Sequence, residues 1–362
     1  MRLLFLGLLF TVINFFIKGK RGIYLMFLGI LIVMGFQGKA GHDYIGYEYY
    51  FSLINSSVDS QYYTDYIESG WILLNKLFSF ANFPIFVFFI SFIQYLILVC
   101  FVGKYVSRNV WVNFAFFLFF FTQSFLGFQL SGLRQGFAIE LLVFSFICVD
   151  KRRYVWALLS ALFMYNIHHS SLVAVPFLVL FYLYTKGHFH KIEKYFHSKI
   201  IIIFPIIFVI LYIVKNTFIN YITPLAAQYS LAEFEGYTQQ LTYIEVSPLI
   251  ILFDFICILA ICLYLKECKG SMRFFCFMSI ISLFGESILF GLSDLPRITY
   301  YFSIFNLVVL PNVGMFLQKK YNKYISIIFV LICCGYALKT FIPYVTSPDI
   351  PRIMNFQFIF EL

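Results

Sequence analysis

The stretch that decides the fold class is residues 84–102, which read PIFVFFISFIQYLILVCFV. These 19 consecutive residues include no charged side chain. A helix needs about 20 mostly apolar residues to cross the hydrocarbon core of a bilayer, which is roughly 30 Å thick. The stretch therefore predicts a transmembrane helix.

The composition of the whole chain agrees with this stretch. Of its 362 residues, 62% are hydrophobic and 12% are charged, whereas a soluble domain has about 45–50% apolar and about 25% charged residues. Aromatic residues make up 22%, which is too much for a core of this size to hide. We therefore expect an all-α polytopic integral membrane protein, with residues 1–362 forming a single transmembrane domain.

Similar apolar segments recur along the chain and predict about twelve transmembrane helices. They are residues 2–17, 22–37, 84–102, 109–127, 131–149, 154–167, 170–185, 200–216, 247–265, 274–291, 298–316 and 325–342. The first is expected to be a membrane helix and not a signal peptide, because no small-residue cleavage site follows it. Pro176 interrupts segment 170–185, so this segment and its short neighbour are also candidates for a re-entrant hairpin.

The distribution of basic residues predicts the orientation. Most Lys and Arg lie in alternate loops, namely 18–21, 104–108, 151–153, 186–199, 266–273 and 319–323, which the positive-inside rule places in the cytoplasm. Both termini and the two long loops, about 38–83 and 217–246, then face outward, together with most of the acidic residues. We therefore expect the functional site on the outer face.

The cysteines and the net charge point to no further chemistry. All eight cysteines lie in or beside apolar segments without the spacing of a zinc site, which indicates small buried hydrophobic residues. The net charge of +9 is spread over several loops, as membrane orientation requires, and is not a nucleic-acid footprint. We predict no metal, no cofactor and no nucleic-acid partner.

The first outer loop combines carboxylates with aromatic rings. Asp43 and Tyr47 would share one face of a helix, and Asp65 and Glu68 lie one turn apart beside Trp71. Carboxylates accept hydrogen bonds from hydroxyl groups, and flat rings cover the apolar face of a sugar, so this pattern suits a polyhydroxylated ligand. The alternative is an interfacial aromatic belt with solvated acids.

Arg134 is the first of two candidate anion-binding residues. It lies at the outer end of segment 131–149, close to Gln129, Ser131 and Gln135. An arginine costs about 2.5–3.5 kcal/mol at the centre of a membrane helix and is functional by default. Near a helix end, its long side chain can instead reach the interface, which relieves that penalty.

Arg297 is the second candidate. It follows Pro296 at the start of an apolar segment, so it is expected in the first turn of a helix, where unpaired N–H groups favour phosphate. The alternative is an ion pair with Asp294.

His168 and His169 occupy the outer turn between segments 154–167 and 170–185. Adjacent residues of a helix point about 100° apart, so the two rings cannot readily share one metal ion. One imidazole could act as a general base or donate to a phosphate oxygen. The alternative is a capped turn whose histidines have internal partners.

These motifs form an ordered series over residues 38–305. It comprises Asp43 with Tyr44 and Tyr47, Glu68-Ser69-Gly70-Trp71, Leu133-Arg134-Gln135, His168-His169-Ser170-Ser171-Leu172, and Arg297 through Tyr301. The series resembles the EpsG-like group of polysaccharide polymerases, which belong with the Wzy O-antigen and capsule polymerases of bacterial inner membranes. One departure is Glu68-Ser69-Gly70, where the usual motif is Glu-Pro-Gly. The spacing to Ser170 favours His168 as the counterpart of the family's single histidine.

The resemblance implies a GT-C-like helical bundle and a metal-independent glycosyltransferase whose active site faces the periplasm. The growing chain, carried on undecaprenyl diphosphate, would pass to the non-reducing sugar of a new lipid-linked repeat unit, in O-antigen lipopolysaccharide or capsule biosynthesis. The implied partners are the lipid-linked oligosaccharide as donor and acceptor, membrane lipid and a chain-length co-polymerase.

The resemblance also suggests roles for individual residues. Arg134 and Arg297 would stabilise the diphosphate, and His168, Asp43 or Glu68 would serve as the base, with His168 favoured. The expected substrate-binding residues are Tyr44, Tyr47, Trp71, Gln135, His169, Tyr300 and Tyr301. The alternatives are a flippase or transporter of a lipid-linked glycan and an O-antigen ligase. The collection of charged motifs on one side favours the polymerase over a transporter.

Overall fold

The computed structural model describes residues 2–17, 20–39, 43–56, 67–107, 109–189, 202–214, 247–289, 296–346 and 356–361, together with residues 199 and 217. The described residues are predominantly helical, as predicted, and include one short two-stranded ribbon. The chain divides into two compact units. The first unit comprises Met1–Tyr182 and Leu317–Leu362, and the second comprises Leu183–Phe316.

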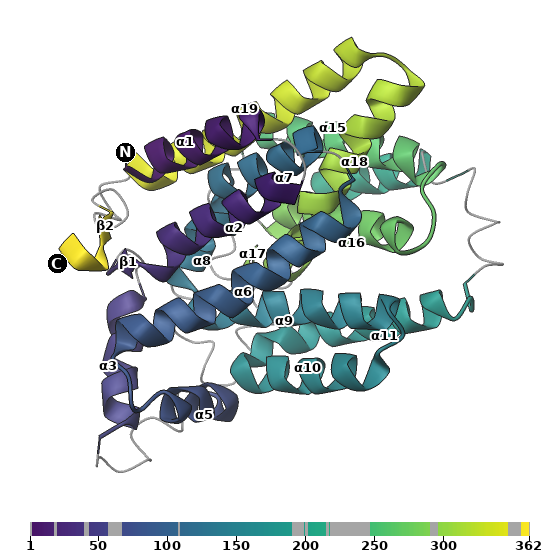
Figure 1. The fold of residues 1–362 in the computed structure, drawn as a ribbon. Helices are drawn as coiled ribbons and strands as arrows, with labels where there is room; N and C mark the ends of the chain where they lie inside the picture. The colour runs from purple at the N-terminus through teal and green to yellow at the C-terminus, as the bar shows by residue number, and fades with distance from the viewer. Residues whose placement is uncertain are drawn as a thin grey trace. The chain divides into compact units, whose positions relative to one another are not determined.

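Helix α6 (Phe83–Tyr105) is the centre of the first unit. Helices α2 (Lys20–Gly35) and α9 (Leu133–Asp150) pack against it, and α10 (Tyr154–Ile167) packs along α9 (Figure 1). Most of α9 is buried, including Gln135, Glu140 and Ser145, whereas many apolar residues of α10 are exposed. This pattern is expected where α9 is enclosed by protein and α10 faces lipid.

A second group of helices in this unit consists of α1 (Arg2–Phe16), α7 (Asn109–Phe121) and α19 (Lys323–Thr346). Two buried amides join α1 to α7, because Nδ2 of Asn14 donates to Oδ1 of Asn113. Polar bonds of this kind hold membrane helices together where the hydrophobic effect does not discriminate between protein and lipid.

The chain bends sharply after α7. A π-helical turn, η1 (Gln123–Gly127), and the short helix α8 (Phe128–Ser131) follow it, and the axis turns by 63°. π-Helical turns are a recognised cause of such kinks. The predicted segment 109–127 is therefore helical to Phe121 and bends after it, and the bend carries the chain into the first turn of α9.

The first of the two long loops, which is predicted to face outward, contains two helices, α3 (Tyr44–Ile54) and α5 (Ser69–Leu77). Helix α3 packs against α5 and α6, and α5 packs against α10 (Figure 1). The intervening residues 57–66, which include Asp65, lie outside the described residues. Just before this loop, β1 (Gln37–Gly38) pairs with β2 (Gln357–Phe358) in an antiparallel ribbon.

The hairpin that begins with α10 continues through a 3₁₀ helix, η2 (His169–Ala174), into α11 (Val175–Thr185). Segment 170–185 changes from η2 to α11 at Val175, next to Pro176, and this proline lies in the first turn of α11, where its missing N–H leaves no helical bond unmade. The backbone is also irregular at His168, where α10 ends in an extended conformation.

The second unit contains α15 (Pro248–Leu265), α16 (Ser271–Leu289), α17 (Pro296–Ser303) and most of α18 (Asn306–Lys320), together with a helix at Ile202–Val214. Helix α16 packs between α15 and α17. The axes of α17 and α18 differ by 47°, so the predicted segment 298–316 is also bent. The second predicted outer loop lies outside the described residues from residue 218 onward.

Four helices in the described part of the chain are long and apolar enough to cross a membrane, namely α6, α15, α16 and α19. The number rises to six if each bent pair is one span, and further apolar helices are shorter. These lengths and compositions are those of a membrane protein. Each of the twelve predicted segments contains a helix, but twelve spans are not established by these lengths.

The buried amide pair gives a test of the packing between α1 and α7. Asn14→Leu should lower the free energy of unfolding by about 1–3 kcal/mol, because it leaves the Asn113 carbonyl without its donor. The double variant Asn14→Leu/Asn113→Leu should recover most of this loss, since it leaves no orphaned amide. Thermal unfolding of the purified protein in detergent measures both. A double variant less stable than the single one would show that the pair is not what joins the helices.

Candidate functional site

Three side chains predicted from separate parts of the sequence meet in the first unit. The Glu68 carboxylate accepts a hydrogen bond from Nη1 of Arg134 at Oε2. Its other oxygen, Oε1, lies 2.9 Å from Nδ1 of His168. The Glu68 side chain is 10% exposed, compared with 22% for Arg134 and 24% for His168. The carboxylate is therefore enclosed, while its two partners remain accessible.

Glu68 is positioned by the start of α5, which is pressed against the end of α10. Ser69 Oγ donates to Oδ1 of Asn166 at 2.9 Å. A β-carbon at Gly70 would lie only 2.8 Å from the Asn166 carbonyl oxygen, so the close approach requires glycine there. Glu68 is extended at the N-cap and does not cap α5 with its side chain, which points instead to Arg134 and His168.

His168 is positioned by the end of α10. Its N–H still donates to the Met164 carbonyl at 3.0 Å, but its own φ and ψ are −158° and 110°, so the helix stops there. The next backbone N–H, that of His169, begins η2 and donates to Oε1 of Glu68 at 3.3 Å. The His169 ring stacks on Tyr165 with centroids 4.8 Å apart. His168 therefore joins the cluster through its ring, and His169 through its backbone.

Arg134 lies in the first turn of α9, directly after the bend that follows α7. A cation at a helix N-terminus is disfavoured by the helix dipole, and the Glu68 carboxylate compensates for this. The guanidinium carbon lies 5.6 Å from the ring centroid of Tyr47 on α3, within cation–π range. Tyr47 in turn packs on Trp71, with centroids 6.0 Å apart. The cluster thus joins α3, α5, α9 and α10.

Burial and the neighbouring charges together shift the pKa values of Glu68 and Tyr47. Burial alone would raise the pKa of Glu68, but the hydrogen bond from His168 and the charge of Arg134 outweigh it and lower the pKa to about 2. Burial raises the pKa of the Tyr47 phenol, and the positive charge of Arg134 opposes this only in part. At neutral pH the site therefore holds an ionised Glu68 and an un-ionised Tyr47.

The other predicted residues of the first unit lie around this cluster. Asp43 precedes α3, and its carbonyl accepts from the Tyr47 N–H at 3.0 Å. Its negative charge also acts on the Tyr47 phenol. Tyr44, Trp71 and Gln135 are buried. In this arrangement Trp71 supports Tyr47 from within the protein and does not present its face to a ligand.

Arg297, Tyr300 and Tyr301 belong to α17 in the second unit. Arg297 is exposed in the first turn, as predicted, Tyr300 is half-buried, and Tyr301 is fully buried. The Glu68 cluster lies in the first unit and contains none of these three residues. Asp294, the alternative partner of Arg297, lies outside the described residues.

Asn166 is a site residue that the sequence analysis did not identify. It shares a polar run with the histidines, but a single asparagine near the C-terminal end of a helix is common without any role in a site. Its contact with Ser69 connects residues 97 positions apart in the chain, and no local pattern could have indicated it.

The arrangement is capable of both proton transfer and anion binding. Glu68 engages Nδ1 of His168, and Nε2 has no partner among the described residues. A carboxylate on one ring nitrogen orients the imidazole and makes the other nitrogen more basic. The buried Nε of Arg134 also has no hydrogen-bond partner among the described residues, so this donor is unused in the structure.

Gly70→Ala tests the contact that aligns the cluster. The added methyl group meets backbone of Asn166, which cannot move away as a flexible side chain could, so we expect a loss of about 1–3 kcal/mol in the free energy of unfolding. Gly46→Ala on α3 is the matched control, because a β-carbon there has nothing within 4 Å. Thermal unfolding in detergent compares the two. Equal stability would contradict the close packing of α5 on α10.

The lowered pKa of Glu68 predicts a pH dependence of stability. A group whose pKa is lowered on folding stabilises the protein above its ordinary value of 4.5 and loses that contribution as the pH falls toward about 2. Glu68→Gln should therefore be less stable than the natural protein at pH 7, and the difference should shrink below pH 4.5. Melting temperatures measured from pH 7 to pH 3 give this comparison. A difference independent of pH would mean that Glu68 is not held as a carboxylate.

The chain was compared with known proteins. No curated protein and no solved structure matches it. A family model described as the EpsG family matches residues 20–355, which is nearly the whole chain and includes all residues of the cluster. The chain therefore belongs to the EpsG family.

Proposed function

We propose that this protein is a membrane glycosyltransferase that polymerises lipid-linked oligosaccharide repeat units into a surface polysaccharide. The observation that carries the proposal is the single cluster in which Glu68 joins Arg134 to His168. An ionised carboxylate that orients both a base and an anion-binding cation suits a reaction that removes a proton and releases a diphosphate. Membership of the EpsG family supports the same assignment.

The substrates are two molecules of oligosaccharide linked to undecaprenyl diphosphate. A hydroxyl oxygen of the acceptor sugar forms a bond to the anomeric carbon of the donor. The bond between that carbon and the phosphate oxygen breaks, and undecaprenyl diphosphate leaves with the electron pair. The acceptor hydroxyl loses its proton. The chemistry therefore requires a base beside the acceptor and positive charge beside the leaving group.

His168 is the proposed base. Its Nδ1 donates to Glu68, which leaves the Nε2 lone pair to accept the proton of the acceptor hydroxyl. Glu68 itself is a poor base, because its pKa of about 2 lies far below the working pH. Glu68 is therefore a positioning residue. Asp43, which lies beside Tyr47, is assigned to the acceptor sugar.

Arg134 is the proposed diphosphate ligand in the first unit, and Arg297 is the proposed ligand in the second. The Arg134 guanidinium already shares its charge with Glu68, and its unpartnered Nε provides a further donor. Preorganised guanidinium groups stabilise charge that accumulates on a leaving group without reorganisation during the reaction. His169, Gln135, Tyr47 and the tyrosines of α17 complete the proposed substrate-binding set.

The proposed setting is the bacterial inner membrane. All twelve apolar segments would cross or enter the bilayer in a single GT-C-like domain, with the cluster facing the periplasm and the basic loops in the cytoplasm. The proposal that the cluster faces the periplasm rests on the first long loop, which is predicted to face outward and contributes α3 and α5 to the cluster. A chain-length co-polymerase is the proposed protein partner.

The test is gel analysis of the surface glycan in a deletion strain carrying plasmid-borne variants. Arg134→Ala, Arg297→Ala and His168→Ala should each reduce long-chain polysaccharide by about 10²-fold or more, with the protein still present in the membrane. Arg134→Lys should recover little, because an ammonium group does not reproduce the guanidinium fork. His169→Ala should cost less activity than His168→Ala, because the backbone contact of residue 169 with Glu68 survives the substitution.

The gel separates the alternatives as well. In the deletion strain, one repeat unit on lipid A indicates a missing polymerase, whereas none indicates a missing ligase or flippase. Normal chain length in either arginine variant would count against diphosphate binding. A larger loss in His169→Ala than in His168→Ala would assign the base to the other histidine.

A further inference from the structure

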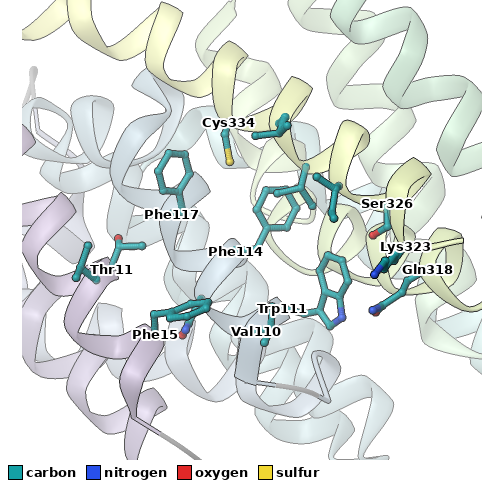
Figure 2. Close-up of a pocket in the computed structure, with 15 residues that line it drawn as sticks. Thr11, Phe15, Val110, Trp111, Phe114, Phe117, Gln318, Lys323, Ser326 and Cys334 are labelled. Carbon is teal, nitrogen blue, oxygen red and sulfur yellow. The ribbon is translucent and has the colours of Figure 1, made fainter.

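The first unit contains a groove that the proposed reaction does not use. It has a volume of about 960 Å³ and is lined by α1, α7, the last turn of α18 and α19 (Figure 2). This volume is at the upper end of the range for ligand pockets, about 300–1,000 Å³. Most of the groove surface is apolar, and residues on its rim, such as Phe15 and Leu331, are among the exposed hydrophobic side chains of the protein. The groove is therefore large enough for a hydrocarbon chain and open to one.

The polar groups of the groove gather at one end. Lys323, Gln318 and Ser326 lie together opposite the indole nitrogen of Trp111, whereas Phe117 and Cys334 lie farther along the groove (Figure 2). The lining includes one charged side chain, the exposed Lys323, and no Asp or Glu. A site with a cationic end and an apolar body matches an amphiphile with an anionic head.

The positive charge at this end is not limited to Lys323. Lys319 and Lys320 end α18 immediately before it, and Lys323 occupies the first turn of α19. The unpaired N–H groups of a helix start add partial positive charge there. Trp111 also suits a headgroup boundary, because indole combines an apolar ring with one N–H donor.

The groove is separate from the Glu68 cluster. Its polar end lies at the start of α7, where Trp111 is found, whereas Arg134 follows the last turn of α7 and the bend after it. The elements that hold Glu68 and His168, α5 and α10, contribute no residue to the groove. An occupant would not compete directly with the proposed substrates.

We propose that this groove binds an anionic glycerophospholipid, with an acyl chain along α7 and α19 and the headgroup phosphate at Lys323. Gln318 and the Trp111 indole donate further hydrogen bonds to the headgroup. The lipid comes from the leaflet that adjoins the basic turn between α18 and α19. Charge complementarity selects it over a zwitterionic phospholipid, whose positive headgroup offsets the attraction to Lys323.

Trp111 allows a direct test, because bromine on an acyl chain quenches a tryptophan that it touches. The protein has three tryptophans, of which Trp156 is 59% exposed and Trp71 is 1% exposed. The full-length protein with Trp156→Phe is titrated in detergent with brominated phosphatidylglycerol or brominated phosphatidylcholine. Phosphatidylglycerol should quench at about fivefold lower concentration, the effect expected of one lysine beside an anionic headgroup.

Four variants locate the effect. Lys323→Gln should abolish the preference for phosphatidylglycerol, whereas Lys319→Gln, at the neighbouring lysine that does not line the groove, should reduce the preference much less. Trp111→Phe in the same background should remove the quenching by both lipids. Cys334→Phe, which fills the apolar part of the groove, should weaken quenching without changing the headgroup charge.

The remaining outcomes would overturn the proposal. Equal quenching by the two lipids would show that the groove does not select an anionic head. A preference unchanged in Lys323→Gln would place the headgroup elsewhere. Displacement of brominated phosphatidylglycerol by undecaprenyl phosphate at a concentration at which unbrominated phosphatidylglycerol has no effect would identify a prenyl lipid as the occupant.

Discussion

The arrangement of the candidate site depends on one enclosed carboxylate. Glu68 accepts hydrogen bonds from a guanidinium at the start of α9, from an imidazole at the end of α10 and from the first N–H of η2. A buried carboxylate is unfavourable unless its oxygens are fully engaged. Because Arg134 and His168 both depend on it, Glu68 determines where a base and a cation lie relative to each other.

Irregular backbone places these groups at helix ends. The π-helical turn after α7 delivers Arg134 to a first turn, and the extended residue His168 ends α10 where Glu68 can reach it. Within a membrane, backbone that departs from the α-helix is tolerated only where protein or water pairs its polar groups. Here the Glu68 carboxylate accepts a hydrogen bond from the backbone N–H of His169. The same side chain therefore gives a backbone donor its partner and orients Arg134 and His168.

The first unit combines two regions of different chemistry. The Glu68 cluster has balanced charges and a rim of polar side chains, which suits a reaction on a polyhydroxylated substrate. The groove at the start of α7 is apolar with one cationic end, which suits a resident lipid. The two regions share no residue, so the proposed lipid and the proposed substrate would bind at separate places.

The sequence by itself determined the all-α membrane class and the approximate positions of the helices, because long apolar segments are local signals. Asp43, Glu68, Arg134 and His168 can be selected from ordered polar motifs that resemble those of the EpsG family. Only the tertiary structure decided that Glu68 joins Arg134 to His168, that Trp71 supports Tyr47 from inside, and that Asn166 holds α5. These contacts connect residues far apart in the chain, and their geometry depends on how helices bend and pack, which no local pattern encodes.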